Sequence, residues 1–314
     1  MYINAIGHYL PSEVVPNSYF KEVNGLSDEW IFQRTGIKER RKASAEENSN
    51  SMAISAISNT VASICYPIEE VDLVVGATYT PYDTVGTIAH VVQRHFDITN
   101  AAALTITSAC SSLINAIEIV EGYFAMGKAT KALVVASEHN TYYSNDSDEK
   151  CGHLWGDGAA AVFLSKDRLS ETDMLVEGVV THGLGHIGRG PEGVLLLPKE
   201  CGIVMPYGKD VFVNACTFMI QGLKELLDAK GLSFGDLNYI VPHQANMRII
   251  TQIASMLDFP LEKIFANIEL FGNTGCGSTA IALSQNKDKF VKNDLLGITV
   301  FGGGYSSGAM LVRV

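Results

Sequence analysis

Two sequence motifs occur twice in this chain at the same spacing, and this repeat limits the possible folds more than any other feature. The segment LNYIVPH (237–243) matches VDLVVGA (71–77), and GCGSTAIAL (275–283) matches ACSSLINAI (109–117). Both pairs are offset by 166 residues (243 − 77 and 276 − 110). A shared offset across two separate motifs indicates duplication of a whole structural unit.

Runs of β-branched and small apolar residues alternate with helical patterns along the chain. We expect buried strands at 71–78, 103–107, 131–137 and 159–165 with helices between them, which predicts an α/β fold. Each half also ends on a strand led by glycine, at 156–165 and 303–314. The connecting segment KDRLSETD (166–173) is charged and has few apolar residues. We therefore predict two similar halves, residues 1–168 and 169–314.

The segment TSACSS (107–112) places Cys110 between a predicted strand and an apolar helix that Gly127 would end. A helix that is apolar nearly all round is expected to be buried. A thiol at its N-terminus faces free N–H groups and the positive end of the helix dipole, which predicts a lowered pKa. Cys110 is thus a candidate nucleophile. The alternative is a buried core cysteine, because free cysteines are among the most buried residues.

The duplication also predicts partners for this thiol. His243 ends the strand that repeats 71–77, at the carboxyl end where open α/β sheets bind ligands. Asn273, in FGNTG, lies three residues before Cys276, the repeat equivalent of Cys110. The glycine-rich segment FGGGYSSG (301–308) can bring backbone N–H groups close to a ligand. Each feature alone has a purely structural interpretation, but two related halves would bring all of them to one cleft.

The composition limits which classes of protein and which cell compartment fit this chain. The net charge of −11 argues against a broad nucleic-acid surface. We find no apolar run long enough for a membrane span and no evident signal peptide. Six cysteines without regular spacing indicate a reduced, cytoplasmic protein. The basic segment RTGIKERRK (34–42) is either a solvated loop or a binding site for an anionic ligand or acidic partner.

Six segments in order resemble the β-ketoacyl-acyl-carrier-protein synthase III family of thiolase-like condensing enzymes. They are DEWIFQRTGIKERR, TSAC, WGDGAAAV, VPHQANMRI, FGNTG and FGGGYSSGAMLVRV. The resemblance spans nearly the whole chain. It implies a duplicated five-layer αβαβα fold and a homodimer. It also implies an acyltransferase that needs no cofactor and no metal and that starts fatty-acid synthesis.

The resemblance assigns a role to each candidate residue. Cys110 takes an acyl group from a thioester, with the N–H groups of Cys110 and Gly303 as the oxyanion hole. His243 and Asn273 then hydrogen-bond the carbonyl of a malonyl thioester on acyl carrier protein while CO₂ leaves. The resulting carbanion attacks the acyl group to give a β-ketoacyl thioester.

The resemblance implies ligand-binding residues as well. Trp30 and Arg34 match positions that hold the nucleotide end of coenzyme A. Arg248 matches a basic residue at the tunnel mouth, suited to a phosphopantetheine phosphate or to acyl carrier protein. Asn246 matches a supporting residue behind the active site.

The chain departs from the family pattern at several positions. Glu149 stands where an arginine is usual, and Val213 stands where a lysine near the carrier-protein entrance is common. Val85 replaces a bulky aromatic residue that caps the acyl pocket of acetyl-selective members. Two serines follow Cys110 in place of Ala-Gly. These changes predict a less basic entrance and an acyl pocket open to longer or branched chains.

Three alternatives stay open at this point. The first is a specialised-metabolism relative that uses a longer or unusual acyl chain or a different acceptor. The second is a Cys-His-Asn thioester hydrolase of papain type, although its architecture is not duplicated. The third is a non-catalytic partner subunit, although such subunits usually lack the thiol or its partners. Cys276 is interpreted as a buried small residue.

Overall fold

The first half of the chain forms a five-stranded sheet in the order β5-β4-β6-β7-β1 in the computed structural model, which describes all residues 1–314. β4 runs parallel to β5 and β6, whereas β7 runs antiparallel to β6 and β1. The strand bounds are Tyr2–Tyr9 for β1, Leu73–Ala77 for β4, Ala102–Ile106 for β5, Lys131–Glu138 for β6 and Gly158–Ser165 for β7. The four predicted strands therefore exist, with ends that differ by at most two residues.

The second half repeats this arrangement in the order β11-β12-β13-β8. These strands are β8 (Met174–Gly183), β11 (Tyr239–Pro242), β12 (Leu295–Gly302) and β13 (Ser306–Arg313). A single parallel bridge between Ile264 and Ile240 takes the place that β5 holds in the first half. β1 and β8 pair at only two positions, and this short contact joins the two sheets.

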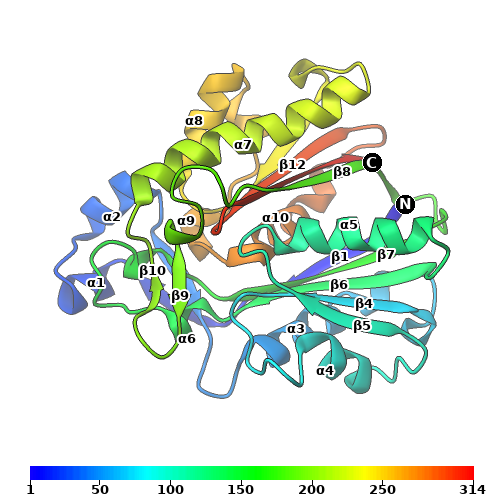
Figure 1. Ribbon diagram of the computed structural model, residues 1–314, viewed down its shortest axis with the longest axis horizontal. Coiled ribbons are helices and arrows are strands. Elements are labelled where there is room, and N and C mark those ends of the chain that lie inside the picture. Colours follow the sequence, from blue (N-terminus) through cyan, green and yellow to red (C-terminus); the bar gives the residue numbers. More distant parts are fainter.

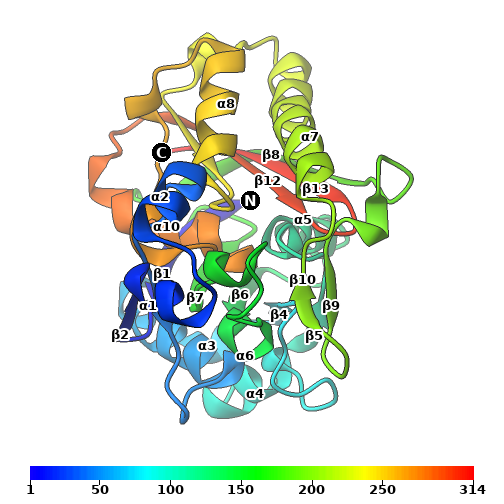
Figure 2. The ribbon, with the colours of Figure 1, turned by 90° about the vertical axis from the view of Figure 1, so that its left-hand side faces the viewer.

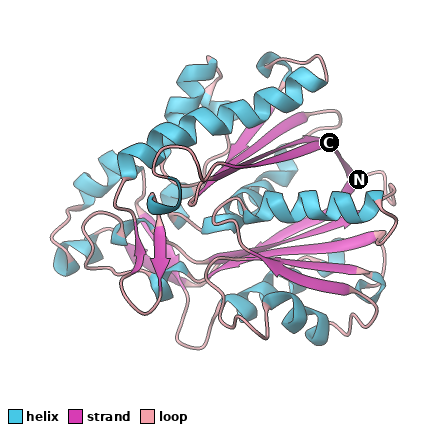
Figure 3. Cartoon of the chain, viewed as in Figure 1, coloured by secondary structure: helices cyan, strands magenta, loops and turns pink.

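Helices separate and cover the two sheets (Figures 1 and 3). α3 (Ser49–Ser58) and α4 (Ile88–His95) lie on the outer face of the first sheet, and α7 (Gly208–Ala229) and α8 (Met247–Leu257) lie on the outer face of the second. α5 (Ser112–Ala125) and α10 (Ser278–Asn286) fill the layer between the sheets. The predicted five-layer αβαβα sandwich of two duplicated halves is confirmed.

The 166-residue offset is visible in the element bounds. β4 begins at Leu73 and β11 at Tyr239, and α5 begins at Ser112 and α10 at Ser278, so both pairs keep that spacing. The two middle helices are buried, as an all-round apolar pattern predicts, and they join one core cluster with residues of both sheets. α5 ends just before Gly127, which has φ +67°. The boundary between residues 168 and 169 stays a prediction; residues 166–173 connect β7 to β8.

Smaller elements gather at one end of the sandwich, which faces the viewer in Figure 2. They are β2 (Glu13–Pro16), β3 (Glu39–Lys42), α1 (Ser18–Val23), α2 (Asp28–Thr35), α6 (Asn140–Tyr143), β9 (Leu195–Leu197), β10 (Gly202–Val204) and α9 (Ile268–Phe271). β2 pairs with β3 and β9 pairs with β10, both antiparallel. None of the helices is both long enough and apolar enough to cross a bilayer.

Candidate active site

One cavity of about 240 Å³ brings together Cys110, His243, Asn273 and Gly303. The four residues come from the turn before α5, the end of β11, the turn before α10 and the turn after β12. The duplicated topology explains this convergence, since equivalent strand ends and helix starts of both halves point to the same region. Most of the remaining lining is apolar, including Val194, Leu195, Leu196, Ile203, Met205, Val211, Met219, Ile249 and Phe301.

Cys110 lies in a tight turn between β5 and α5. Ala109 before it has φ +49°, a left-handed conformation that few residues other than glycine adopt. Ser112 closes this turn, because its Oγ accepts the Ser108 N–H at 2.7 Å and donates to the Ala109 carbonyl at 2.6 Å. The sulfur is thereby held at the cavity wall.

The prediction of a lowered thiol pKa is wrong. Burial raises the pKa of Cys110 to about 12, and the nearby Glu138 carboxylate acts in the same direction. A hydrogen bond with the Tyr79 hydroxyl lowers the pKa, but by less. Cys110 therefore rests as a neutral thiol, and a role as nucleophile would require it to lose this proton.

His243 is buried and neutral. Burial lowers its pKa to about 4, well below its usual 6.5. Its Nδ1 lies 2.7 Å from Ser278 Oγ, and the same oxygen accepts the Gln244 N–H at 3.3 Å. Because Ser278 Oγ already accepts the Gln244 N–H, we assign its hydroxyl as the donor to His243 Nδ1, and this assignment puts the ring proton on Nε2. His243 thus offers a hydrogen-bond donor to the cavity.

Asn273 offers a second donor. Its Oδ1 accepts the Gly275 N–H at 2.9 Å, which fixes the orientation of the amide and leaves Nδ2 free. The side chain is buried, with 3% of its surface exposed. Two neutral N–H donors beside a thiol can bind a carbonyl oxygen and stabilise negative charge that develops on it.

Two backbone N–H groups can form a second donor pair. The N–H groups of Cys110 and Gly303 have no backbone acceptor in the chain, and both residues line the cavity. The neighbouring Gly302 lets the turn after β12 approach the Cys110 turn. A Cβ at Gly302 would lie 2.6 Å from the Ser108 carbonyl oxygen and 2.9 Å from the Ser111 nitrogen.

The other predicted binding residues lie outside the cavity wall. Trp30 and Arg34 are on α2, where the Arg34 guanidinium stacks 4.2 Å from the centroid of the Trp30 ring. Arg248 is exposed near the start of α8, which packs against α2 (Figure 2). Asn246 is the N-cap of α8, because its Oδ1 accepts the Arg248 N–H at 2.8 Å. Its local contact is therefore with the backbone of α8.

Val85 does not line the cavity of its own chain. It lies in the loop between β4 and α4 with 85% of its surface exposed. Glu149 and Val213, the other two departures from the family pattern, are also exposed. In the single chain, Val85 therefore makes no contact with this cavity.

Sequence reasoning did not find Ser278, Tyr79 or Glu138. Ser278 could have been found, because it is the repeat equivalent of Ser112 at the start of a buried helix. Tyr79 and Glu138 carry no motif, and only the fold brings them to the Cys110 turn. Cys276 is buried, does not line the cavity and donates to the Ala77 carbonyl at 3.3 Å.

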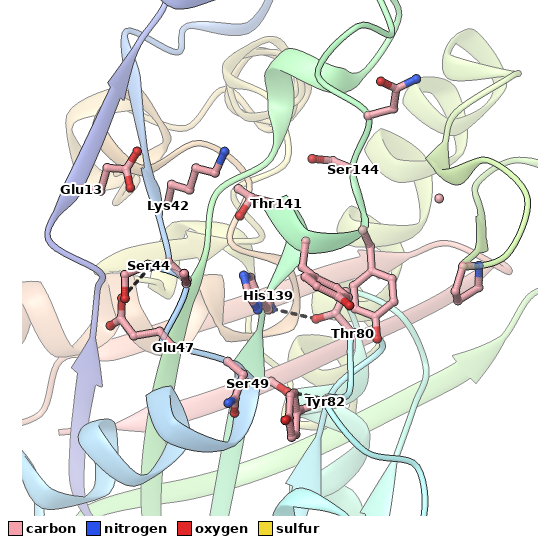
Figure 4. A pocket seen from close by; sticks show the side chains of 18 of the residues that line it. Glu13, Lys42, Ser44, Glu47, Ser49, Thr80, Tyr82, His139, Thr141 and Ser144 are labelled. Atoms are coloured by element: carbon pink, nitrogen blue, oxygen red, sulfur yellow. Dashed lines mark hydrogen bonds between the residues drawn. The ribbon is translucent and has the colours of Figure 1, made fainter.

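A second cavity of about 1,410 Å³ is lined in part by residues 139 and 141–145 (Figure 4). Its wall is largely polar and includes Lys42, Glu47, His139 and Thr141. It contains none of Cys110, His243 and Asn273, so the reactive groups belong to the smaller, apolar cavity.

Proteins of similar sequence point to one family of acyl-carrier-protein synthases. The family described as 3-oxoacyl-[acyl-carrier-protein] synthase III matches residues 104–182, and its C-terminal part matches residues 227–314. A β-ketoacyl-[acyl-carrier-protein] synthase III of Aquifex aeolicus is 34% identical over 98% of this chain and 97% of its own length.

Solved structures agree with this assignment. The crystal structure of 3-oxoacyl-[acyl-carrier-protein] synthase III from Aquifex aeolicus has a TM-score of 0.92 and 34% identity, covering 100% of this chain and 99% of that chain. The priming β-ketosynthase of the R1128 polyketide pathway has a TM-score of 0.89 and 27% identity, covering 99% and 95%. The chain therefore belongs to the β-ketoacyl-acyl-carrier-protein synthase III family of thiolase-fold condensing acyltransferases.

Proposed function

We propose that Cys110 is acylated by an acyl thioester and that the acyl group is then joined to malonyl-acyl carrier protein with loss of CO₂. The product is a β-ketoacyl-acyl carrier protein that starts an acyl chain. The observation that carries this proposal is the pair of neutral donors, His243 Nε2–H and Asn273 Nδ2–H, in the cavity of the Cys110 thiol. Such a pair suits an enolate, which needs donors and no base.

The acylation step uses the Cys110 turn. The sulfur attacks the thioester carbonyl while the N–H groups of Cys110 and Gly303 bind the oxygen that becomes negative. The bond to the donor sulfur breaks, and the Cys110 proton leaves with the donor thiol. The step therefore needs no cofactor and no other proton acceptor at its end.

The condensation step uses the second half of the chain. His243 and Asn273 bind the malonyl thioester carbonyl, and loss of CO₂ puts its electron pair into the enolate. The enolate carbon attacks the acyl carbonyl, the bond to the Cys110 sulfur breaks, and the released thiolate takes up a proton from solvent. A neutral His243 suits this role, because its Nε2–H stabilises the enolate oxygen without donating a full proton.

A papain-type hydrolase fits the site less well. That mechanism needs a histidine that removes the thiol proton. Here burial lowers the pKa of His243 to about 4, and Ser278 holds the tautomer whose cavity-facing nitrogen already carries hydrogen. A non-catalytic subunit is disfavoured because thiol, donors and cavity are all present.

A specialised role with a longer acyl chain is the second candidate function. The cavity beside Cys110 is lined by Leu195, Leu196, Ile203 and Met205 from the β9–β10 hairpin and its flanks, which suits an aliphatic chain. The replacement of a large aromatic residue by Val85 supports this function from the sequence alone, because Val85 does not line the cavity of the single chain. The likeness to a polyketide priming ketosynthase is consistent with it.

The proposed partners are a second copy, coenzyme A thioesters and acyl carrier protein. β5 is an edge strand that pairs only with β4, and the nearby loop exposes Tyr82 and Val85, so this face suits a homodimer. Trp30, Arg34 and Arg248 on α2 and α8 offer aromatic and basic groups for the nucleotide and phosphate of the acyl donor. Six free cysteines fit the reducing cytoplasm, where we place the protein.

Intact-protein mass spectrometry tests the proposal. The protein is incubated with acyl-coenzyme A and acyl-acyl carrier protein donors of increasing chain length, beside a Cys110→Ala control. We expect a mass gain of one acyl group that the control lacks, followed by its loss and β-ketoacyl product when malonyl-acyl carrier protein is added. Strict acetyl preference would contradict the longer-chain candidate. Release of free acid without condensed product would favour the hydrolase.

A further inference from the structure

Asn140 is a polar side chain with 0% of its surface exposed, and it lines neither of the two cavities. It is the first residue of α6 and lies two residues beyond the end of β6. Its Nδ2 donates to the Gly156 carbonyl at 2.8 Å and to the Asn273 carbonyl at 3.2 Å. Asn140 thus links the first half of the chain to the residue that carries one of the two proposed enolate donors.

The partners of Asn140 fix the orientation of its amide. The Gly156 and Asn273 carbonyls can only accept, so Nδ2 must face them. The Tyr79 hydroxyl donates to Asn140 Oδ1 at 2.7 Å on the other side of the amide. A buried amide with three partners resists reorientation, because each lost hydrogen bond would leave a buried polar group unsatisfied.

The backbone of Asn273 is held by residues of the first half. Its N–H donates to the Leu154 carbonyl at 2.8 Å, and its carbonyl accepts the Gly156 N–H at 3.0 Å in addition to Asn140 Nδ2. Three hydrogen bonds therefore fix the peptide groups on both sides of the Asn273 Cα. Because the side chain starts at this Cα, its direction into the cavity depends on these bonds.

Tyr79 also packs against the turn that orients the Asn273 side chain. Asn273 Oδ1 accepts the Gly275 N–H at 2.9 Å. Gly275 has φ +61°, and a Cβ there would lie 2.8 Å from Tyr79 Oη and 2.6 Å from Glu138 Cγ. The hydrogen-bonded pair of Tyr79 and Asn140 thus contacts both the backbone of Asn273 and the residue that holds its amide.

We infer that Asn140 is a positioning residue for condensation, which directs the Asn273 Nδ2–H toward the oxygen of the enolate. This inference rests on the proposed role of Asn273 as an enolate donor. Such a donor acts fully only when it points at the oxygen that becomes negative, so a rotated Asn273 weakens the transition state more than the bound malonyl thioester. Acylation uses the N–H groups of Cys110 and Gly303 and should not depend on Asn140.

Asn140→Ala tests the inference when the two half-reactions are measured separately. Acyl-enzyme is mixed with malonyl-acyl carrier protein at increasing concentrations, and loss of the Cys110 adduct is followed by mass spectrometry. We expect the maximal condensation rate to fall by roughly 10- to 10²-fold with little change in the half-saturating concentration, because a misplaced catalytic group costs up to about 10² in rate. Acylation should stay within a few-fold of the wild type.

Asn4→Ala is the matched control. Asn4 Nδ2 donates to Ser165 Oγ at 2.9 Å, and Asn4 Oδ1 accepts the Tyr66 hydroxyl, so its bonds are of the same kind as those of Asn140. Ser165 is the last residue of β7, whereas Gly156 lies just before that strand begins. Asn4 lines neither cavity. Both half-reactions of Asn4→Ala should match those of the wild type.

A double variant separates positioning from general damage to the site. Asn273→Ala already lacks the donor, so the addition of Asn140→Ala should slow condensation no further. Multiplication of the two single effects would overturn the inference, as would an equal fall in acylation or wild-type condensation in Asn140→Ala. A wild type that forms no Cys110 adduct or no β-ketoacyl product would instead overturn the proposed function, and this inference with it.

A second design keeps the inference testable if Asn140→Ala does not fold. Tyr79→Phe combined with Asn140→Leu removes the donor and the acceptor of one hydrogen bond together and nearly keeps the size of both side chains. Such a replacement costs less stability than a single unpaired group. The bond to the Asn273 carbonyl is lost as well, so condensation should fall as in Asn140→Ala. Condensation at the wild-type rate in this variant would count against the inference.

Discussion

Replacing Asn273 by alanine or by aspartate should slow condensation and leave acylation nearly unchanged. Of the two variants, Asn273→Asp should condense more slowly. Asn273→Ala removes the Nδ2–H donor that faces the cavity. Loss of one such donor costs about 2.7–4 kcal/mol, or roughly 10²–10³ in rate. Asn273→Asp keeps the size of the side chain and the acceptor for the Gly275 N–H, which lies 2.9 Å from Oδ1 in the native protein. It turns the free donor into a negatively charged oxygen.

The charge makes Asn273→Asp the slower variant. Two unit charges about 4 Å apart repel by about 4 kcal/mol at an effective dielectric constant of about 20, so an ionised carboxylate beside the enolate costs up to roughly 10³ more than alanine. Burial raises the pKa of such a carboxyl group. Its protonated form can donate a hydrogen bond, so condensation by Asn273→Asp should recover as the pH falls.

The assay starts from acylated Cys110. The acyl-enzyme is mixed with malonyl-acyl carrier protein, and loss of the adduct is followed at several pH values by mass spectrometry. Acylation itself should stay within a few-fold of the wild type in both variants, because the proposed oxyanion hole uses the N–H groups of Cys110 and Gly303. Equal losses for alanine and aspartate at every pH would refute this reasoning, as would an acylation rate that falls in parallel.

Three further changes test neighbouring parts of the site. Burial lowers the pKa of His243 from 6.5 to about 4, so the unfolded chain binds a proton at this residue before the folded chain does as the pH falls. The free energy of unfolding should therefore drop by up to about 3 kcal/mol between about pH 6.5 and 4. In urea titrations, His243→Gln should remove that part of the drop. Ser278→Ala frees His243 to adopt the wrong tautomer and should slow condensation by about tenfold while acylation, measured by adduct formation, is retained. Gly302→Ala places a Cβ 2.6 Å from the Ser108 carbonyl oxygen and should slow acylation by about 10² or more, whereas Gly183→Ala, with no atom within 4 Å of its Cβ, should not.

The sequence predicts the fold well because its two motifs are repeated. Two motifs share one offset, and the structure keeps that offset at the starts of β4 and β11 and of α5 and α10. Once the halves are known to be equivalent, the convergence of Cys110 with His243 and Asn273 follows from topology. No detailed knowledge of side-chain packing is needed for that step.

The electrostatics of the site could not be predicted in the same way. A helix start suggests a lowered thiol pKa, but burial and Glu138 raise the pKa of Cys110 to about 12. Glu138 ends β6 and Tyr79 follows β4, and their distance from the thiol depends on how the two strands pair. The position of Val85 could not be predicted either. Its loop is exposed in the single chain, and the sequence alone does not show whether the residue lines the cavity.

Equivalent serines of the repeat make different contacts in the two halves. Ser112 and Ser278 are equivalent first residues of the two buried helices. In the first half, the hydroxyl binds its own turn and holds the Cys110 segment closed. In the second half, the Cys276 side chain is buried against Ala77, and the equivalent hydroxyl turns instead to His243 Nδ1. The two equivalent serines therefore fix the proposed nucleophile in one half and the proposed donor tautomer in the other, so loss of each should impair a different half-reaction.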